Sequence, residues 1–388
     1  MKIKTLFWLA FLMAASFAVA QRNPPCGGLS AKASLDWPQF RLDPCHTGYN
    51  PNELILDPTN VGKLVLDWKY TTRYLIFSSP AVVNGVVYVG SWDYSVYALN
   101  ARTGAFIWKY TTGAEVNTGA EINSSPAVAN GVVYVGSFDH NLYALNADTG
   151  ALLWKFRTGK NIYTSSPAVA NGVVYIGSAD NNLYALNAAT GALLWKYTTG
   201  GEIFSSPAVA NGVVYIGIDS SELYALQADT GALLWSDPIG TAEGSSPAVA
   251  NGVVYVGSND HNVYALDAST GAVLWKDPIP SLTLSSPAVA NGVVYAATSD
   301  GTLFALDAAT GASVWTYPTF SEIGSSPTVA NGVVYVGSGD RMYGLNAATG
   351  AVMWKYTGDF VDSSPTVVNG AVYIGSVDGL YSFHLPGQ

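Results

Sequence analysis

The stretch that decides the fold is residues 124–158, which read SSPAVANGVVYVGSFDHNLYALNADTGALLWKFRT. It contains four short apolar runs separated by turn residues, and none of them has the 3.6-residue period of an amphipathic helix. Asn130 and Gly131 suit the two positive φ angles of a tight hairpin, and a second turn follows at residues 148–150. The pattern predicts an antiparallel meander with strands near 125–129, 132–136, 142–146 and 151–156.

The same pattern recurs along the chain, and this self-similarity is the strongest signal in the sequence. The phrase Ser-Ser-Pro, followed by Ala or Thr and then Val, begins at Ser78, Ser124, Ser165, Ser205, Ser245, Ser285, Ser325 and Ser363. The strands read as continuous apolar runs, as expected where both faces of a sheet pack against neighbours. Four-stranded meanders repeated radially form a β-propeller. The sequence therefore predicts an all-β protein, an eight-bladed β-propeller of four-stranded antiparallel blades.

The two ends of the chain indicate how the ring closes. The eighth repeat stops at His384 without a Thr-Gly turn or a tryptophan, so its outermost strand is missing. Residues 68–72 repeat residues 108–112 letter for letter, although no other strand of a blade precedes them. We expect the strand at 64–71 to complete the last blade, which protects an edge that could otherwise pair with other chains.

One tryptophan per blade follows from this arrangement. They are Trp68, Trp108, Trp154, Trp195, Trp235, Trp275, Trp315 and Trp354. Residues 98–108, ALNARTGAFIW, resemble the tryptophan-docking motif of the propellers named after pyrroloquinoline quinone (PQQ) enzymes. The resemblance covers about residues 35–385, including the entry phrase at 36–41. It implies that each tryptophan docks against the Gly and Ala of a neighbouring motif.

That family contains both enzymes and binding proteins. Its quinoprotein dehydrogenases use PQQ with a calcium ion and a catalytic carboxylate, whereas BamB-like members are non-catalytic scaffolds. This chain has no adjacent cysteine pair and no long insertion that could cover a cofactor, and it is poor in the cations that the three PQQ carboxylates need. The resemblance is therefore closer to the BamB-like members. We expect no catalytic residue, no metal and no cofactor, and PQQ with calcium is the alternative.

Other catalytic chemistry finds little support. The sequence has no Gly-x-Ser-x-Gly, phosphate-loop or His-Glu-x-x-His motif, and His46, His140, His261 and His384 do not cluster. An aspartate recurs in the second loop of most repeats, at Asp93, Asp139, Asp180, Asp260, Asp300, Asp340 and Asp378. Such a ring could suggest calcium or catalysis. Short aspartates commonly hold tight loops by accepting backbone N–H groups, and we favour this structural interpretation.

The N-terminus indicates export. Residues 1–20 have the charged, apolar and small-residue order of a signal peptide, and residues 21–62 form an extension before the propeller at 63–388. The two cysteines, Cys26 and Cys45, fall in that extension and are expected to form a disulfide. Removing residues 1–20 takes two lysines from 17 basic residues and leaves 27 acidic ones, a net charge of −12. We expect a monomeric periplasmic or extracellular protein without a transmembrane segment or a nucleic-acid partner.

Variation among the repeats points to one face. The Asn-Gly and Thr-Gly turns on one side are monotonous, while the second loop of each repeat and the connections between repeats vary. Large side chains gather there in the first four repeats, and the candidate partner-binding residues are Tyr74, Trp92, Tyr94, Phe138, His140, Tyr163 and Phe204. The sequence predicts that this face binds a protein or a glycan. Two alternatives stay open: the rings fill gaps between blades, or the chain is a structural surface repeat protein.

Overall fold

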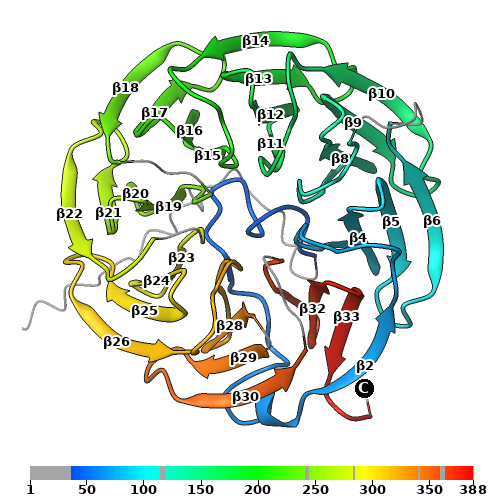
Figure 1. The fold of residues 1–388 in the computed structure, drawn as a ribbon, viewed down its shortest axis with the longest axis vertical. Coiled ribbons are helices and arrows are strands. Elements are labelled where there is room, and N and C mark those ends of the chain that lie inside the picture. The colour runs from blue at the N-terminus through cyan, green and yellow to red at the C-terminus, as the bar shows by residue number, and fades with distance from the viewer. Residues whose placement is uncertain are drawn as a thin grey trace, which may run out of the picture.

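The computed structural model describes residues 36–113, 119–240, 244–282, 285–339, 341–358 and 363–387. Their strands form eight sheets, arranged radially around one axis (Figure 1). The expected eight-bladed all-β propeller is confirmed. The innermost strand of each blade is short, and the outermost strand runs along the rim of the ring (Figure 1).

In the first seven blades, four strands follow one another along the chain from the axis outwards. Blades one to seven are β3 (Ala81–Val83), β4 (Val86–Ser91), β5 (Ser95–Asn100) and β6 (Phe106–Thr111); β7 (Ala127–Ala129), β8 (Val132–Gly136), β9 (Asn141–Asn146) and β10 (Leu152–Arg157); β11 (Ala168–Ala170), β12 (Val173–Ser178), β13 (Asn182–Asn187) and β14 (Leu193–Thr198); β15 (Ala208–Ala210), β16 (Val213–Gly217), β17 (Glu222–Gln227) and β18 (Leu233–Pro238); β19 (Ala248–Ala250), β20 (Val253–Ser258), β21 (Asn262–Asp267) and β22 (Val273–Pro278); β23 (Ala288–Ala290), β24 (Val293–Ala297), β25 (Thr302–Asp307) and β26 (Ser313–Pro318); and β27 (Thr328–Ala330), β28 (Val333–Ser338), β29 (Arg341–Asn346) and β30 (Val352–Thr357).

Blade eight joins the two ends of the chain. It consists of β31 (Thr366–Val368), β32 (Ala371–Ser376), β33 (Gly379–His384) and, as its outermost strand, β2 (Val65–Tyr70). Two short elements precede β2: β1 (Tyr49–Asn50), which pairs parallel with β27, and a 3₁₀ turn, η2 (Val61–Lys63).

Local sequence explains the blade geometry. Asn130 and Gly131 have φ angles of 51° and 76°, and Ala129 pairs with Val132 across this hairpin. The innermost strand begins two residues later than expected. Pro126 has no N–H to donate to the ladder, and the Ser125 N–H donates to the Ser166 hydroxyl of the next blade instead (2.9 Å).

The hydrophobic core is divided among the spaces between blades. Eight clusters of buried apolar side chains each join two neighbouring blades, among the residues that the structure describes. Between blades one and two, for example, Tyr88 and Val96 pack with Val133 and Leu145. Because both faces of a blade are covered, its middle strands need apolar residues on both sides, which explains the continuous apolar runs.

Each blade tryptophan contacts the next blade in the same way. Trp108, for instance, donates its indole N–H to the Ala147 carbonyl (2.8 Å) and lies against Gly150, where a Cβ would overlap the indole. Gly150 also has a φ of +70°, so both its backbone conformation and the space beside the indole favour glycine. The same indole-to-carbonyl bond joins Trp68 to Ala101, Trp154 to Ala188, Trp195 to Ala228, Trp235 to Ala268, Trp275 to Ala308 and Trp315 to Ala347. How much these contacts stabilise the ring stays a prediction.

The expected closure by the N-terminal strand is confirmed. β2 pairs antiparallel with β33, with Trp68 opposite Ser382. An ion pair between Lys69 and Asp378 (2.5 Å) spans the seam, and the His384 ring lies 3.1 Å from the Asp67 carboxylate. Burial lowers the His384 pKa, so this second contact is charged on both sides only at acid pH. On the other side of blade eight, the Trp354 indole N–H donates to the Leu64 carbonyl (3.0 Å), so residue 64 takes the place of the alanine found at the other joints.

The seam leaves one tyrosine without its usual partner. In the other blades the second-strand tyrosine donates to the same alanine carbonyl as the tryptophan, as Tyr134 does to Ala188 (2.9 Å). The Tyr335 hydroxyl is buried, and no described residue accepts its proton, because the closing segment has no equivalent alanine.

This difference predicts opposite responses to the same substitution. Tyr134→Phe removes a satisfied buried hydrogen bond and leaves a carbonyl short of a donor, so the free energy of unfolding should fall by about 1 kcal/mol. Tyr335→Phe removes a hydroxyl that is already unpaired and should leave stability unchanged or raise it. Urea unfolding of the two variants measures the difference, and equal losses would contradict the assigned seam.

Candidate functional site

Residues 36–50 occupy the axis of the ring, where the chain crosses the centre of Figure 1. Trp37 exchanges two backbone hydrogen bonds with Val82 of blade one. The segment then accepts one backbone N–H from each of the next six innermost strands: Val128 to Pro38, Val169 to the Gln39 side chain, Val209 to Pro44, Val249 to Cys45, Val289 to Thr47 and Val329 to Gly48. Asn50 completes the circuit by donating to the Val367 carbonyl of blade eight (2.9 Å). Residues 36–50 of the expected extension thus lie inside the propeller.

Arg41 anchors this segment. Its side chain is fully buried, and its two terminal nitrogens donate to the carbonyls of Pro327 (2.5 Å) and Pro287 (2.6 Å). Gly48 makes room for it, because a Cβ there would overlap the guanidinium. Burial lowers the Arg41 pKa to about 9, while Asp43 acts in the opposite direction. The guanidinium therefore joins the segment to blades six and seven.

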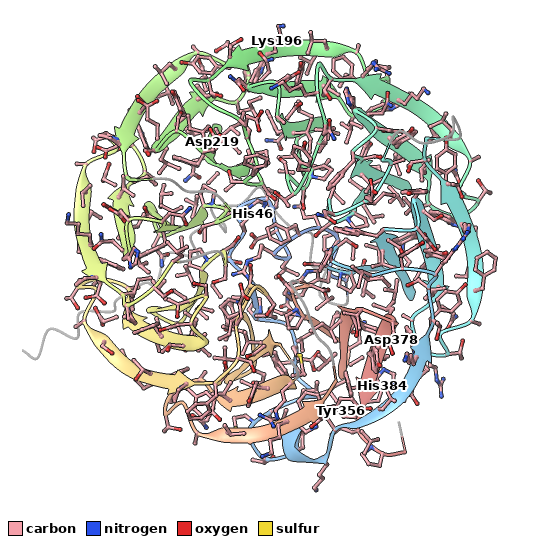
Figure 2. The ribbon with its side chains drawn as sticks, viewed as in Figure 1. His46, Lys196, Asp219, Tyr356, Asp378 and His384 are labelled. Atoms are coloured by element: carbon pink, nitrogen blue, oxygen red, sulfur yellow. The ribbon has the colours of Figure 1, made fainter. Side chains whose placement is uncertain are left out.

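His46 lies beside Arg41, near the axis (Figure 2). Its ring is 0% exposed and meets Phe40 edge-on at 5.4 Å between centroids. Among the described residues, neither ring nitrogen has a partner at full hydrogen-bonding geometry, although the Pro247 carbonyl is close enough to raise the His46 pKa slightly. Burial, and secondarily the charge of Arg41, lower the His46 pKa to about 3, so the ring is neutral at physiological pH.

Eight serines form a closed ring around the axis. They are the second serine of each Ser-Ser-Pro phrase: Ser79, Ser125, Ser166, Ser206, Ser246, Ser286, Ser326 and Ser364. The backbone N–H of each donates to the side-chain oxygen of the next, at 2.8 to 3.0 Å, and Ser364 returns to Ser79. Since the serines come before the valines in each phrase, the ring lies nearer the varied face than the contacts of residues 37–50.

A cavity of about 670 Å³ lies on the axis and reaches this serine ring. All eight ring serines line it, together with Phe40 from the axial segment. The rest of the lining comes from the varied loops and connections: Phe77, Trp92, Asn123, Thr164, Phe204, Gly244, Asn259, Leu282 and Gly324. The volume falls within the range of about 300–1,000 Å³ that is usual for small-molecule sites.

Two positions of the repeat supply most of the wall. One is the residue before Ser-Ser-Pro, as at Phe77 and Phe204, and the other is the residue before the loop aspartate, as at Trp92 and Asn259. Aromatic side chains come from blades one to four, whereas Gly244, Asn259 and Gly324 come from the later blades. The side-chain oxygen of Asn259 is buried and has no hydrogen-bond partner among the described residues.

The structure brings together some of the predicted partner-binding residues. Trp92 and Phe204 line the cavity, and Trp92 packs edge-on against Phe77 at 4.9 Å and donates its indole N–H to Asn123. Tyr163 lies between Phe138 (4.9 Å) and Phe204 (5.6 Å), so these three rings form one cluster beside the cavity.

The other predicted residues lie outside the cavity. Tyr74 and Tyr94 are 53% and 42% exposed, and Arg73 lies over the Tyr74 ring. Tyr94 and His140 occupy the same left-handed loop position, with φ angles of 68° and 72°. Sequence reasoning missed Phe40, Asn259 and the serine ring.

The described loop aspartates hold their loops together. Asp139 accepts the Asn141 N–H (3.1 Å) and the Tyr143 hydroxyl (2.5 Å), and its own N–H donates to Ser137 (3.2 Å). Asp180 and Asp260 repeat this arrangement, while Asp340 lies outside the described residues. Within the described ranges, no group of three or more His, Cys, Asp or Glu side chains could hold a metal ion.

Several N-terminal predictions fall outside the description. The predicted signal peptide and Cys26 lie within residues 1–35, which the structure does not describe. Cys45 is buried against Val209, and no described cysteine is free. Because Cys26 lies outside the described residues, the Cys26–Cys45 disulfide stays a prediction. The described part of the chain also contains no helix long and apolar enough to cross a membrane.

The cavity does not suit PQQ with calcium. None of its described lining residues carries a charge, so nothing there could pair with three carboxylates or hold a divalent cation. The stretches missing from the description between residues 36 and 387 contain no Lys, Arg or His. A PQQ anion bound here would lose its hydration without gaining a counter-charge.

Comparison with known proteins finds the same architecture in both kinds of relative. A family model described as outer membrane protein assembly factor BamB matches residues 60–161, 139–219, 219–322 and 318–384. Quinohemoprotein alcohol dehydrogenase from Comamonas testosteroni is 34% identical over 93 residues, which is 23% of this chain and only 13% of that enzyme.

Solved structures show the fold alone, because their sequence identities are low. BamB from Moraxella catarrhalis superposes with a TM-score of 0.71 at 20% identity, covering 82% of this chain and 99% of that one. Quinohemoprotein alcohol dehydrogenase ADHIIG from Pseudomonas putida HK5 superposes with a TM-score of 0.79 at 19% identity, covering 95% of this chain and 83% of that one.

Proposed function

The chain belongs to the BamB-like family of PQQ-type propellers, and from this premise we propose that it is a non-catalytic binding or scaffold protein of the cell envelope or exterior. Its partner, a protein or a glycan, binds the face that carries the second loops and the connections between blades. The observation that carries this proposal is the axial cavity, whose described lining carries no charge and includes aromatic side chains from that face. No cofactor is required for such a role.

Two further features support the proposal. Residues 37–50 bind the backbone of the innermost strands at their valines, which lie towards the Asn-Gly turns. The space left for a ligand on the axis is therefore at the opposite end, towards the varied loops. The signal-peptide pattern and the predicted Cys26–Cys45 disulfide fit the envelope location implied by the family description. The uncharged lining argues against the alternative of a PQQ-dependent dehydrogenase.

Exposed aromatic side chains on this face can be substituted to test partner binding without changing the packing of the hydrophobic core. Tyr94→Asn is compatible with the left-handed φ of 68°, because asparagine occupies the equivalent position at Asn181 with a φ of 66°. If Tyr94 contacts the partner, the variant should weaken capture of that partner from envelope extract by about 1 to 3 kcal/mol. The melting temperature should stay within the error of the parent value.

A matched control lies on the same face of another blade. Phe320 is 86% exposed and also has a left-handed φ of 67°, but it follows blade six. Phe320→Asn should leave capture of the partner unchanged. The two variants therefore distinguish a specific site at Tyr94 from nonspecific binding by exposed aromatic side chains. Equal retention of the partner by parent, Tyr94→Asn and Tyr74→Ala would overturn the proposed binding face and favour a structural repeat protein.

A further inference from the structure

The floor of the axial cavity offers eight hydroxyl protons. Each ring serine accepts a backbone N–H through its oxygen, and no described residue accepts its O–H proton. Phe40 belongs to the same lining and adds an aromatic surface. A purely apolar ligand would leave these hydroxyls unpaired in a desolvated site, which is unfavourable. The floor therefore favours a ligand that carries many hydrogen-bonding oxygens.

One part of the cavity wall is aromatic and another part is polar. Phe77, Trp92 and Phe204 present aromatic surface from blades one to four, and Asn259 presents an amide from blade five. Its side-chain oxygen is buried and lacks a described donor, so a turn of the amide towards the cavity would let a ligand hydroxyl satisfy it. A ligand that fits this wall needs both apolar C–H surface and hydroxyl groups.

Charge narrows the ligand class further. The described lining contains no Lys, Arg, Asp or Glu. The nearby Arg41 is not part of the lining, and its terminal nitrogens are already engaged by the carbonyls of Pro287 and Pro327. Because the described lining offers no counter-charge to a desolvated ion, it favours a neutral occupant.

We propose that the axial cavity binds a neutral saccharide, with sugar C–H faces packed on Trp92, Phe77 and Phe204 and sugar hydroxyls bonded to the serine ring and Asn259. Pyranose rings combine apolar C–H faces with hydroxyl rims, which matches the division of the wall. The inference rests on the proposed function as a binding protein and names the ligand class for its cavity. Blades one to four supply the stacking surface, and blade five supplies the amide.

The test uses the whole mature protein and a defined set of probes. Neutral gluco-, galacto-, manno- and N-acetylglucosamine oligosaccharides are screened on an array, and hits are measured by titration calorimetry. Sulfated counterparts and PQQ with Ca²⁺ serve as charged comparators. We expect saturable binding of at least one neutral saccharide and at least tenfold weaker binding of its sulfated counterpart and of PQQ.

Two variants locate the site. Trp92→Ala should weaken saccharide binding at least tenfold, although it also removes a packed ring. Asn259→Ala removes an amide oxygen that has no described partner, so it should weaken binding about tenfold without lowering the melting temperature. Phe320→Asn, on the same face but outside the described cavity lining, should bind like the parent.

Each outcome is decisive. The proposal is overturned if no neutral saccharide of the panel binds, if a charged comparator binds as tightly, or if Asn259→Ala and Trp92→Ala both bind like the parent. Should saccharide binding be absent while Tyr94→Asn still weakens partner capture, the saccharide site fails and the proposed binding face stands. If a neutral saccharide binds and loses affinity in Asn259→Ala, the site stands whatever the capture result.

Discussion

Replacing Trp68 by alanine should lower the free energy of unfolding by about 3 kcal/mol, the lower end of the range for large core aromatic side chains, because Trp68 is only partly buried. The Trp68 indole donates to Ala101 (3.1 Å) and lies against Gly104 of blade one, while its backbone belongs to the strand that completes blade eight. One substitution therefore weakens both the interface between blades eight and one and the seam. Urea unfolding followed by circular dichroism measures the loss.

Truncation separates the seam from ordinary packing. Removing residues 21–72 leaves the last described strand, β33, without its partner β2, and an unpaired edge favours association between chains. Removing only residues 21–56 deletes the axial segment but keeps β2. We expect the longer truncation to form oligomers on size exclusion, and the shorter one to stay monomeric with a lower melting temperature. A monomeric 21–72 truncation that melts like the parent would contradict closure by β2.

The blades and their closure could be predicted because they depend on side-chain patterns that repeat. Asn130-Gly131 specifies a hairpin through its φ angles, and the copy of residues 108–112 at 68–72 identifies the closing strand. The path of residues 36–50 could not be predicted. Its contacts with the inner strands mostly use backbone groups, which every residue carries, so no sequence period reveals them. Gln39, Arg41 and Asn50 do contribute side chains, and Gly48 leaves room for Arg41, but these residues belong to no repeat.

The candidate site was predicted in part. Unevenly distributed aromatics pointed to Trp92 and Phe204, which line the cavity, and to Phe138 and Tyr163, which pack beside Phe204. Asn259 was missed because only large side chains were sought. Comparison of one position across the repeats could have found it, since the residue before the loop aspartate is Trp92 in blade one and Asn259 in blade five.

The serine ring was missed for a different reason. The Ser-Ser-Pro phrase served only to mark the repeats, and the backbone N–H that each ring serine accepts shows that these serines also support the fold. The same hydroxyl also keeps a proton that faces no acceptor in the described chain. A position can therefore serve folding through its oxygen and binding through its proton, and invariance among repeats does not separate the two roles.

The buried histidine at the axis should make the protein sensitive to acid. His46 titrates near pH 6.5 when unfolded, whereas burial and Arg41 lower its pKa to about 3 in the folded chain. Between these values only the unfolded state binds the proton, so stability present above pH 6.5 is lost progressively as the pH falls towards 3. One pKa unit corresponds to about 1.4 kcal/mol, so a shift from 6.5 to about 3 gives a total loss of roughly 5 kcal/mol.

A substitution isolates this contribution from that of other groups. His46 has a φ of 57°, a left-handed conformation that asparagine tolerates, so His46→Asn removes the titrating ring at little backbone cost. The free energy of unfolding of this variant should decline less steeply between pH 6.5 and 4 than that of the parent. Burial raises the pKa of Asp43, which opposes the loss at the acid end of this range, but it does so in both proteins.

His140→Asn is the matched control, because His140 also has a left-handed φ, of 72°, but lies in a loop away from the axis. It should retain the steep decline of the parent. Denaturant unfolding at half-unit pH steps measures all three proteins. If the parent and His46→Asn lose stability at the same rate, then His46 accepts a proton inside the folded ring, which requires the axial segment to open or an acceptor such as the Pro247 carbonyl to pair with the charged ring.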